Sequence, residues 1–396
     1  MSASNDTNEG GIQNALSGVQ KAALTIGILA SLAIGFGWTQ DKSAVQHAYL
    51  HSYLFWLAPT VGSLSLYMLH QLTGGRWGAA IRRILEAGMR TIPFMALAFI
   101  PIVLWMQDLY PWARPDEVKG DALLEHKASW LNPSFFIVRA AAYFVIWFVL
   151  SKVMLGVSKK RDMGDHAAAK TARLTAGPGF LVYALTMTFA SFDWAMSLEP
   201  HWFSTMYGAI FLVGQGLATM TFAIMFSAWL SKRDPFSKLL APNHFHDLGT
   251  LTFAMVLLHA YTNFSQYLII WSGNLNEETP WVHVRSSTSW QHLAQTLVMF
   301  HFFVPFFLLL SRKNKQAPKI VAGIAALLCL SRFLDIAWYI GPAFHPEGFH
   351  VSWIDLVMPF ALGGLWVAFF VQMFKNRPLV SAQDLELAGS LQPAHH

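Results

Sequence analysis

Long apolar runs alternate with short polar connections along almost the whole chain. Each run has about 20 residues, the length that a helix needs to cross roughly 30 Å of hydrocarbon. Lipid offers no partner for an exposed backbone amide, so each run is predicted to be helical. The ten runs cover residues 20–38, 48–72, 91–107, 133–156, 178–196, 203–230, 248–272, 290–311, 318–341 and 352–374. The pattern predicts an all-α, polytopic membrane protein with about ten transmembrane helices, and a count of nine or eleven remains open.

Lysine and arginine are distributed unevenly between the connections. Of the 27 basic residues, 20 lie in the two terminal segments and in the connections on their side of the membrane. Only 5 lie in the alternate connections, and Arg139 and Arg332 lie within spans. Basic residues concentrate on the cytoplasmic side, so both termini are predicted to be cytoplasmic. The expected organisation is an N-terminal tail at 1–19, a transmembrane domain at 20–374 and a C-terminal tail at 375–396.

Composition supports the membrane prediction and excludes several other classes of protein. Hydrophobic residues make up 54% of the chain and charged residues only 12%, about half of what soluble domains contain. The net charge of +5 arises mainly in short connections, where it sets topology, so we expect no nucleic-acid partner. A single cysteine, Cys329, excludes an internal disulfide, an iron–sulfur cluster held by this chain alone and a C-x-x-C-H haem attachment.

Candidate chemistry first appears in the stretch Phe189 to Gly208, which lies between two apolar runs on the predicted outer side. Asp193, Glu199 and His201 stand there among aromatic residues. Ionisable groups at a membrane boundary often mark a proton, ion or substrate route, which makes these three the candidate proton or quinol groups. The alternative is an interfacial aromatic belt in which the acids are simply hydrated.

Further polar side chains lie inside the predicted spans. His259, Asn263 and Gln266 are spaced four and three apart, so they share one helical face. Arg332 and Asp335 are three apart and can form an ion pair. These groups either line a quinone pocket or proton path or serve as hydrogen-bonding contacts between helices. The candidate lining residues are His259, Asn263, Gln266, His292, Arg332 and Asp335.

Most of these groups are predicted to lie in the outer half of the membrane. Oxidation of a quinol releases two protons with its two electrons, so a carboxylate or imidazole must accept them and pass them outward. We expect no resident metal. A bis-histidine haem would need facing imidazoles at one depth, and His259 with His301 is the one mid-membrane pair. A haem-b membrane cytochrome and a secondary transporter are the alternatives.

Two strings carry a resemblance to a known family. FDWAMSLEPHWFSTMYG, which ends at Gly208, and NFSQYLIIWSGNLNEETPW, from Asn263 to Trp281, resemble an ActF-type membrane subunit of bacterial alternative complex III. That complex is a quinol:electron-acceptor oxidoreductase, and its membrane subunits are related to the NrfD and polysulfide-reductase anchors. The resemblance extends over most of the chain, from the first span to the last.

The resemblance implies a subunit of the bacterial inner membrane that has no redox metal and no covalently bound cofactor of its own. It implies three partners: a multihaem cytochrome c, an iron–sulfur protein and a second, homologous NrfD-like membrane subunit. In the family, quinol oxidation is assigned to that second subunit. A quinone pocket in this chain is therefore an expectation beside two others, an outward proton route and a scaffolding role.

Overall fold

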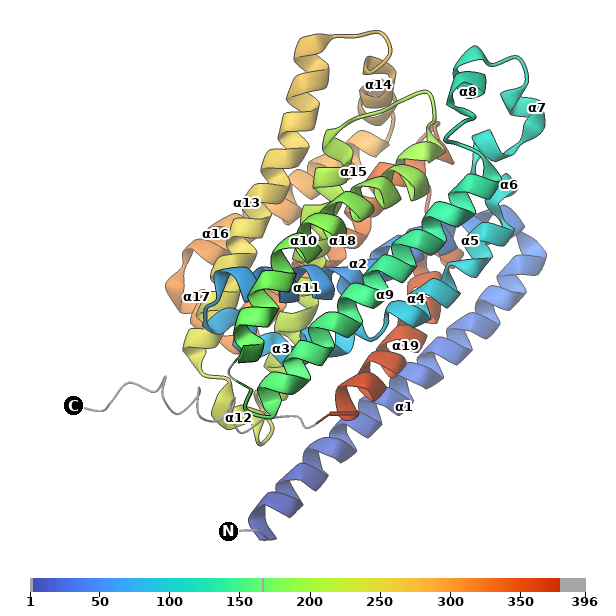
Figure 1. Ribbon diagram of the computed structural model, residues 1–396. Coiled ribbons are helices and arrows are strands. Elements are labelled where there is room, and N and C mark those ends of the chain that lie inside the picture. The colour runs from blue at the N-terminus through green and yellow to red at the C-terminus, as the bar shows by residue number, and fades with distance from the viewer. Residues whose placement is uncertain (1–2, 166, 378–396) are drawn as a thin grey trace.

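A computed structural model describes residues 3–165 and 167–377, and these residues form helices and turns without a strand. The long helices form one bundle (Figure 1). They are α1 (Ala3–Gln40), α2 (Lys42–Thr73), α3 (Arg76–Met89), α9 (Pro133–Asp162), α10 (Ala167–Trp194), α11 (Met206–Leu230), α13 (Pro242–Gly273), α18 (Pro318–Ile340) and α19 (Trp353–Lys375). Of these, α2 crosses behind most of the others (Figure 1). α15 (Trp290–Leu297), the π-helical turn η3 (Val298–Phe303) and α16 (Val304–Leu310) form one further continuous segment.

Short helical segments connect the long ones. They are α4 (Ile92–Ala98), α5 (Ile100–Leu104), α6 (Met106–Leu109), η1 (Pro111–Ala113), α7 (Pro115–Val118), α8 (Ala122–Lys127), η2 (Met196–Leu198), α12 (Phe236–Leu239), α14 (Thr279–Ser287), α17 (Arg312–Gln316) and η4 (Gly341–Ala343). α7, α8 and α14 lie at one end of the bundle, and the start of the chain and α12 lie at the other (Figure 1). The connections predicted to face outward are thus gathered at one end.

Eight helical segments of the described chain are long and apolar enough to cross a membrane. They are Gly11–Gln40, Arg76–Leu104, Pro133–Asp162, Ala167–Leu198, Met206–Leu230, Trp290–Leu310, Pro318–Ala343 and Trp353–Lys375. The chain is therefore all-helical with the features of a multi-pass membrane protein. α2 and α13, the other two predicted spans, are 32 residues long but are not among the eight. Their histidines, hydroxyls and amides lower their mean hydropathy.

The boundaries differ from the predicted ones in two places. α1 already begins at Ala3, so the helix extends through most of the predicted tail at 1–19. The third predicted span, 91–107, is preceded by α3, a helix that the predicted spans did not include. Two of its arginines are paired with a distant carboxylate, since Arg82 and Arg83 both lie 2.9 Å from Asp162. The predicted C-terminal tail, 375–396, lies almost entirely outside the described residues.

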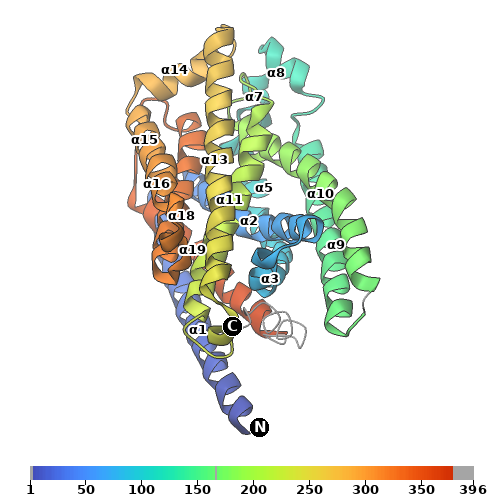
Figure 2. The same ribbon diagram turned by 90° about the vertical axis from the view of Figure 1, so that its left-hand side faces the viewer.

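α11 lies at the centre of the bundle and packs against α2, α10, α13 and α18 (Figure 2). Near the end of the bundle that carries α7, α8 and α14, Trp194 at the end of α10 is fully buried beneath Phe99, Phe144 and Trp147, with ring centroids 4.7 to 5.8 Å away. Aromatic packing of this kind fixes the end of α10. It therefore also fixes the position of the neighbouring Asp193.

α1 is attached to the bundle mainly along α19. The two helices cross at Gly27 and Gly364, where a Cβ built on Gly364 would lie only 2.5 Å from the backbone nitrogen of Gly27. Small residues allow this close approach of two backbones in a membrane. The rest of α1 is largely exposed, with apolar side chains such as Leu32 and Phe36 pointing away from the protein.

Candidate functional site

Asp193 is fully paired. Its side chain is 1% exposed, and Arg139 of α9 donates to both of its oxygens at 2.8 Å. Tyr143 donates its hydroxyl at 2.8 Å and Trp130 donates its indole N–H at 3.0 Å. The guanidinium also packs 4.3 Å from the Trp130 ring centroid. Asp193 thus joins α9, α10 and the connection between α8 and α9.

Glu199 forms a second ion pair at the same end of the bundle. Arg285 of α14 donates to it at 2.7 and 3.2 Å, and the Trp281 indole donates at 3.0 Å. The connection between α10 and α11, residues 195–205, is here called the hairpin. Trp281 stacks on Trp202 of the hairpin with ring centroids 4.3 Å apart, and its ring lies 3.7 Å from the Arg285 guanidinium. The Glu199 side chain remains 26% exposed, so this pair stands at the boundary with solvent.

His201 lies apart from both pairs. Its side chain is 61% exposed, and its Nε2 lies 2.6 Å from the Asp121 carboxylate. The Leu124 amide, followed by the His201 ring, lowers the pKa of Asp121 below its ordinary value of 3.8. The contact holds α8 against the hairpin, and the structure does not bring His201 together with Asp193 or Glu199 into one site.

The cluster of side chains best suited to carry out chemistry lies deeper in the protein, between α13, η3 and α18. His259, Asp335 and Arg332 are all buried. The predicted ion pair of Arg332 with Asp335 is confirmed, and His259 Nε2 lies 3.1 Å from the same carboxylate. Because a carboxylate only accepts hydrogen bonds, Nε2 must carry the proton that it donates to Asp335. The ring's other nitrogen, Nδ1, is then the acceptor.

Two ring nitrogens of this cluster are buried without a partner: His259 Nδ1 and His301 Nε2. The two rings lie with centroids 4.8 Å apart. His301 belongs to η3, and π-helical turns of this kind often occur at functional sites. Buried polar atoms are rarely left unpaired, so these two call for a functional explanation.

A proton is the charge that this cluster accommodates best. The ligand atoms of His259, His301 and Asp335 lie within 4.8 Å of one another and could hold a metal ion by distance alone. Arg332 already neutralises Asp335, however, so a divalent cation would leave a large uncompensated positive charge in a buried place. The contact between the two rings also leaves no space for a porphyrin between them.

Amide and hydroxyl groups extend the cluster along α13. Asn263 Nδ2 donates to the His259 carbonyl at 2.8 Å, and the Tyr339 hydroxyl donates to Asn263 Oδ1. One turn farther, Gln266 accepts from Ser204 of the hairpin at 3.3 Å. The predicted shared face of these three α13 residues thus contacts α18 and the hairpin.

The remaining candidate, His292, lies on the exposed surface of α15 and outside the cluster. Sequence reasoning did not single out Arg285 or Tyr339. Tyr339 follows Asp335 by four residues, so helical spacing could have placed it on the face of the cluster. Arg285 gave no comparable signal, because its partner Glu199 is 86 residues away.

A scan of family models and a search of curated proteins find no match to the chain.

Proposed function

We propose that this membrane protein is a subunit of a quinol-oxidising complex of the alternative complex III type, and that it carries protons toward the outer side. The observation that carries the proposal is the buried cluster of His259, His301 and Asp335, with its two unpartnered ring nitrogens. The resemblance of the two sequence strings supports the choice of complex. The ten-span topology with cytoplasmic termini belongs to the same proposal.

The geometry supports proton transfer in a specific order. An imidazole accepts a proton on one nitrogen and releases another from the opposite one. A proton that reaches His259 Nδ1 makes an imidazolium, which Asp335 stabilises through Nε2 at 3.1 Å. We assign proton exchange with Nδ1 to His301, whose ring contacts His259, although no hydrogen bond joins the two unpartnered nitrogens in this arrangement. Arg332 holds Asp335 ionised and in place.

Asn263 and Tyr339 continue the polar chain from His259 toward the outer end. Tyr339 also connects to the Glu199 pair, because its backbone carbonyl accepts from Arg285 at 2.8 Å. Glu199 is the partly exposed carboxylate where a proton would leave. A quinone pocket in this chain, formed by the aromatic residues near the hairpin, is the second part of the proposal. Asp193 fits a structural role better, because all of its contacts are with donors.

In this proposal, other subunits of the complex supply the electron-transfer centres. A multihaem cytochrome c and an iron–sulfur protein would take the electrons, and a homologous membrane subunit would oxidise the quinol in the bacterial inner membrane. Purification of the tagged chain in a mild detergent, followed by mass spectrometry, tests this. Recovery with those three proteins supports the proposal. Recovery of the chain alone or as a homo-oligomer contradicts it and favours a transporter.

Proton transfer is tested in the complex reconstituted into vesicles, by measuring protons released outside for each quinol oxidised. We expect His301→Gln to reduce that ratio or slow release at least about a hundredfold, the low end of what a positioned proton-transfer group contributes. His292→Gln is the matched control, because it removes an exposed histidine only nine residues earlier on the same segment. Equal proton release by both variants, with assembly intact, would contradict the route.

A further inference from the structure

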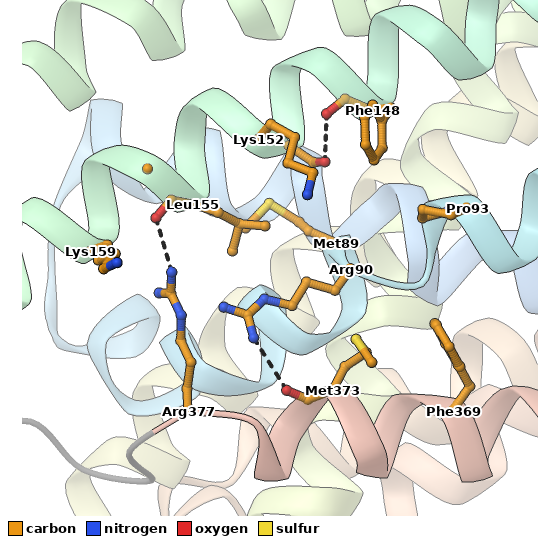
Figure 3. Close-up of a pocket in the computed structure, with 12 residues that line it drawn as sticks. Met89, Arg90, Pro93, Phe148, Lys152, Leu155, Lys159, Phe369, Met373 and Arg377 are labelled. Atoms are coloured by element: carbon orange, nitrogen blue, oxygen red, sulfur yellow. Dashed lines mark hydrogen bonds between the residues drawn. The ribbon is translucent and has the colours of Figure 1, made fainter.

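A cavity of about 480 Å³ opens at the end of the bundle opposite the hairpin. It lies between α3, α4, α9 and α19 (Figure 3). Ligand sites commonly have volumes of this order. A Cβ built on Gly156, which lines the cavity, meets no atom within 4 Å. The space is therefore open at that point of α9.

Four cationic side chains line the cavity: Arg90, Lys152, Lys159 and Arg377. None of the twelve described residues that line it is acidic. Arg377 pairs at 3.2 Å with Glu86, which lies outside the lining, and donates to the Leu155 carbonyl. The other three form no ion pair with a carboxylate of the described chain. Such a concentration of positive charge is unfavourable unless an anion enters it.

Arg90 and Arg377 extend into the same space from different helices. Figure 3 shows their guanidinium groups pointing toward one another, with Lys159 beside them. Arg90 donates to the Met373 carbonyl at a long 3.4 Å, so most of its N–H groups remain available. Guanidinium groups in this arrangement match the oxygens of a phosphate.

The other side of the cavity is apolar. Pro93, Phe148 and Phe369 line it, and they lie on the opposite side of the space from Lys159 and Arg377 (Figure 3). Lys152 connects the basic and the apolar sides of the cavity, because its ammonium group is cationic and lies 5.0 Å from the Phe148 ring centroid. A ligand that fills both halves must carry an anionic group and a hydrocarbon chain.

We infer that this cavity binds an anionic phospholipid, with its phosphate between Arg90, Arg377 and Lys159 and an acyl chain along Phe148 and Phe369. The four cations come from segments on the side where the chain concentrates lysine and arginine. Basic pockets between helices on that side of a membrane suit anionic headgroups. A soluble phosphate shares the headgroup chemistry but leaves the apolar half of the cavity unused. The inference is independent of the proposed proton route.

The test measures thermal unfolding of the purified full chain in a neutral detergent, with native mass spectrometry of bound lipid. Phosphatidylglycerol is titrated against phosphatidylcholine of equal chain length and against inorganic phosphate. We expect phosphatidylglycerol to raise the unfolding midpoint by about 5 °C at a hundredfold excess over its Kd. Phosphatidylcholine and phosphate should leave it unchanged. Equal shifts with both lipids, or a shift with phosphate that equals that of phosphatidylglycerol, would overturn the inference.

Two variants distinguish the contribution of the lysine charges to lipid binding from that of the open space in the cavity. Lys152→Gln with Lys159→Gln should weaken phosphatidylglycerol binding about 25-fold, from about fivefold for each basic residue removed. Lys170→Gln with Lys319→Gln is the matched control, because both lysines are exposed and lie outside the cavity lining. Gly156→Leu fills the cavity and keeps every charge, and it should abolish the lipid adduct. Unchanged lipid affinity in both cavity variants would refute the site.

Discussion

Replacing Asp193 by asparagine tests whether this buried carboxylate holds together the end of the bundle that carries α7 and α8. It accepts four hydrogen bonds of 2.8 to 3.0 Å, two of them from Arg139. An asparagine would place its amide N–H groups opposite the N–H and O–H donors that now contact Asp193, and these donors need an acceptor. It would also leave Arg139, which is 6% exposed, without a counter-charge. Removing one partner of a buried ion pair costs about 3–5 kcal/mol. We expect a loss of that size in the free energy of unfolding.

Reversible unfolding in mixed detergent micelles, followed by tryptophan fluorescence, measures this loss. Asp116→Asn is the control, because Asp116 lies exposed in α7 at the same end of the bundle. The double variant Asp193→Asn with Arg139→Gln should lose less stability than the sum of the two single variants, since it leaves no isolated charge. If Asp193→Asn proves as stable as Asp116→Asn, the assignment of a structural role to Asp193 is refuted.

Three further predictions concern other contacts. Gly214→Ala should cost about 1–3 kcal/mol of unfolding free energy, because its Cβ would lie 2.4 Å from the Arg332 guanidinium carbon; an unchanged unfolding midpoint would contradict this. Trp281→Ala removes the ring stacked on Trp202 and should cost about 3–5 kcal/mol in the same assay, whereas a loss below 1 kcal/mol would argue against the stack. Hydrogen bonding lowers the pKa of Asp121 in the folded protein. The stability that ionised Asp121 gives to the fold is therefore complete above the ordinary pKa of 3.8, and it is lost as the pH falls through the lower pKa of the folded protein. Hydrogen exchange should therefore show α8 protected from pH 7 to 4 and exposed only below, and earlier loss would contradict it.

The helical architecture was largely predictable because membrane spans are encoded locally. Each run of about 20 apolar residues specifies a helix without reference to its neighbours. The segment 76–89 falls between two predicted apolar runs, so no helix was predicted there. In the structure it forms α3, whose Arg82 and Arg83 meet Asp162 about 80 residues later in the chain, and hydropathy contains no information about such a partner.

Contacts within one helix were equally predictable, and contacts between helices were not. The spacing of Arg332 and Asp335 indicated their ion pair, and the spacing of His259 and Asn263 indicated a shared face. Nothing in the spacing placed Asp193 against Arg139, which lies 54 residues away. The sequence therefore identified polar groups worth examining. The sequence could not show that Asp193 is fully paired, whereas the cluster of His259 and His301 contains ring nitrogens without a hydrogen-bond partner.

The Gly27–Gly364 crossing has a consequence for how the protein is made. Among the described helices, α1 comes first in the chain, and its main partner, α19, comes last. During synthesis α1 must stay undocked in the bilayer, where its exposed leucines and phenylalanine face lipid, until the later segments have been inserted. α19 then docks against α1 at the Gly27–Gly364 crossing, which joins the first and the last of the described long helices. A truncated product that lacks α19 would keep a membrane-inserted but undocked first helix, a form that membrane quality control can recognise.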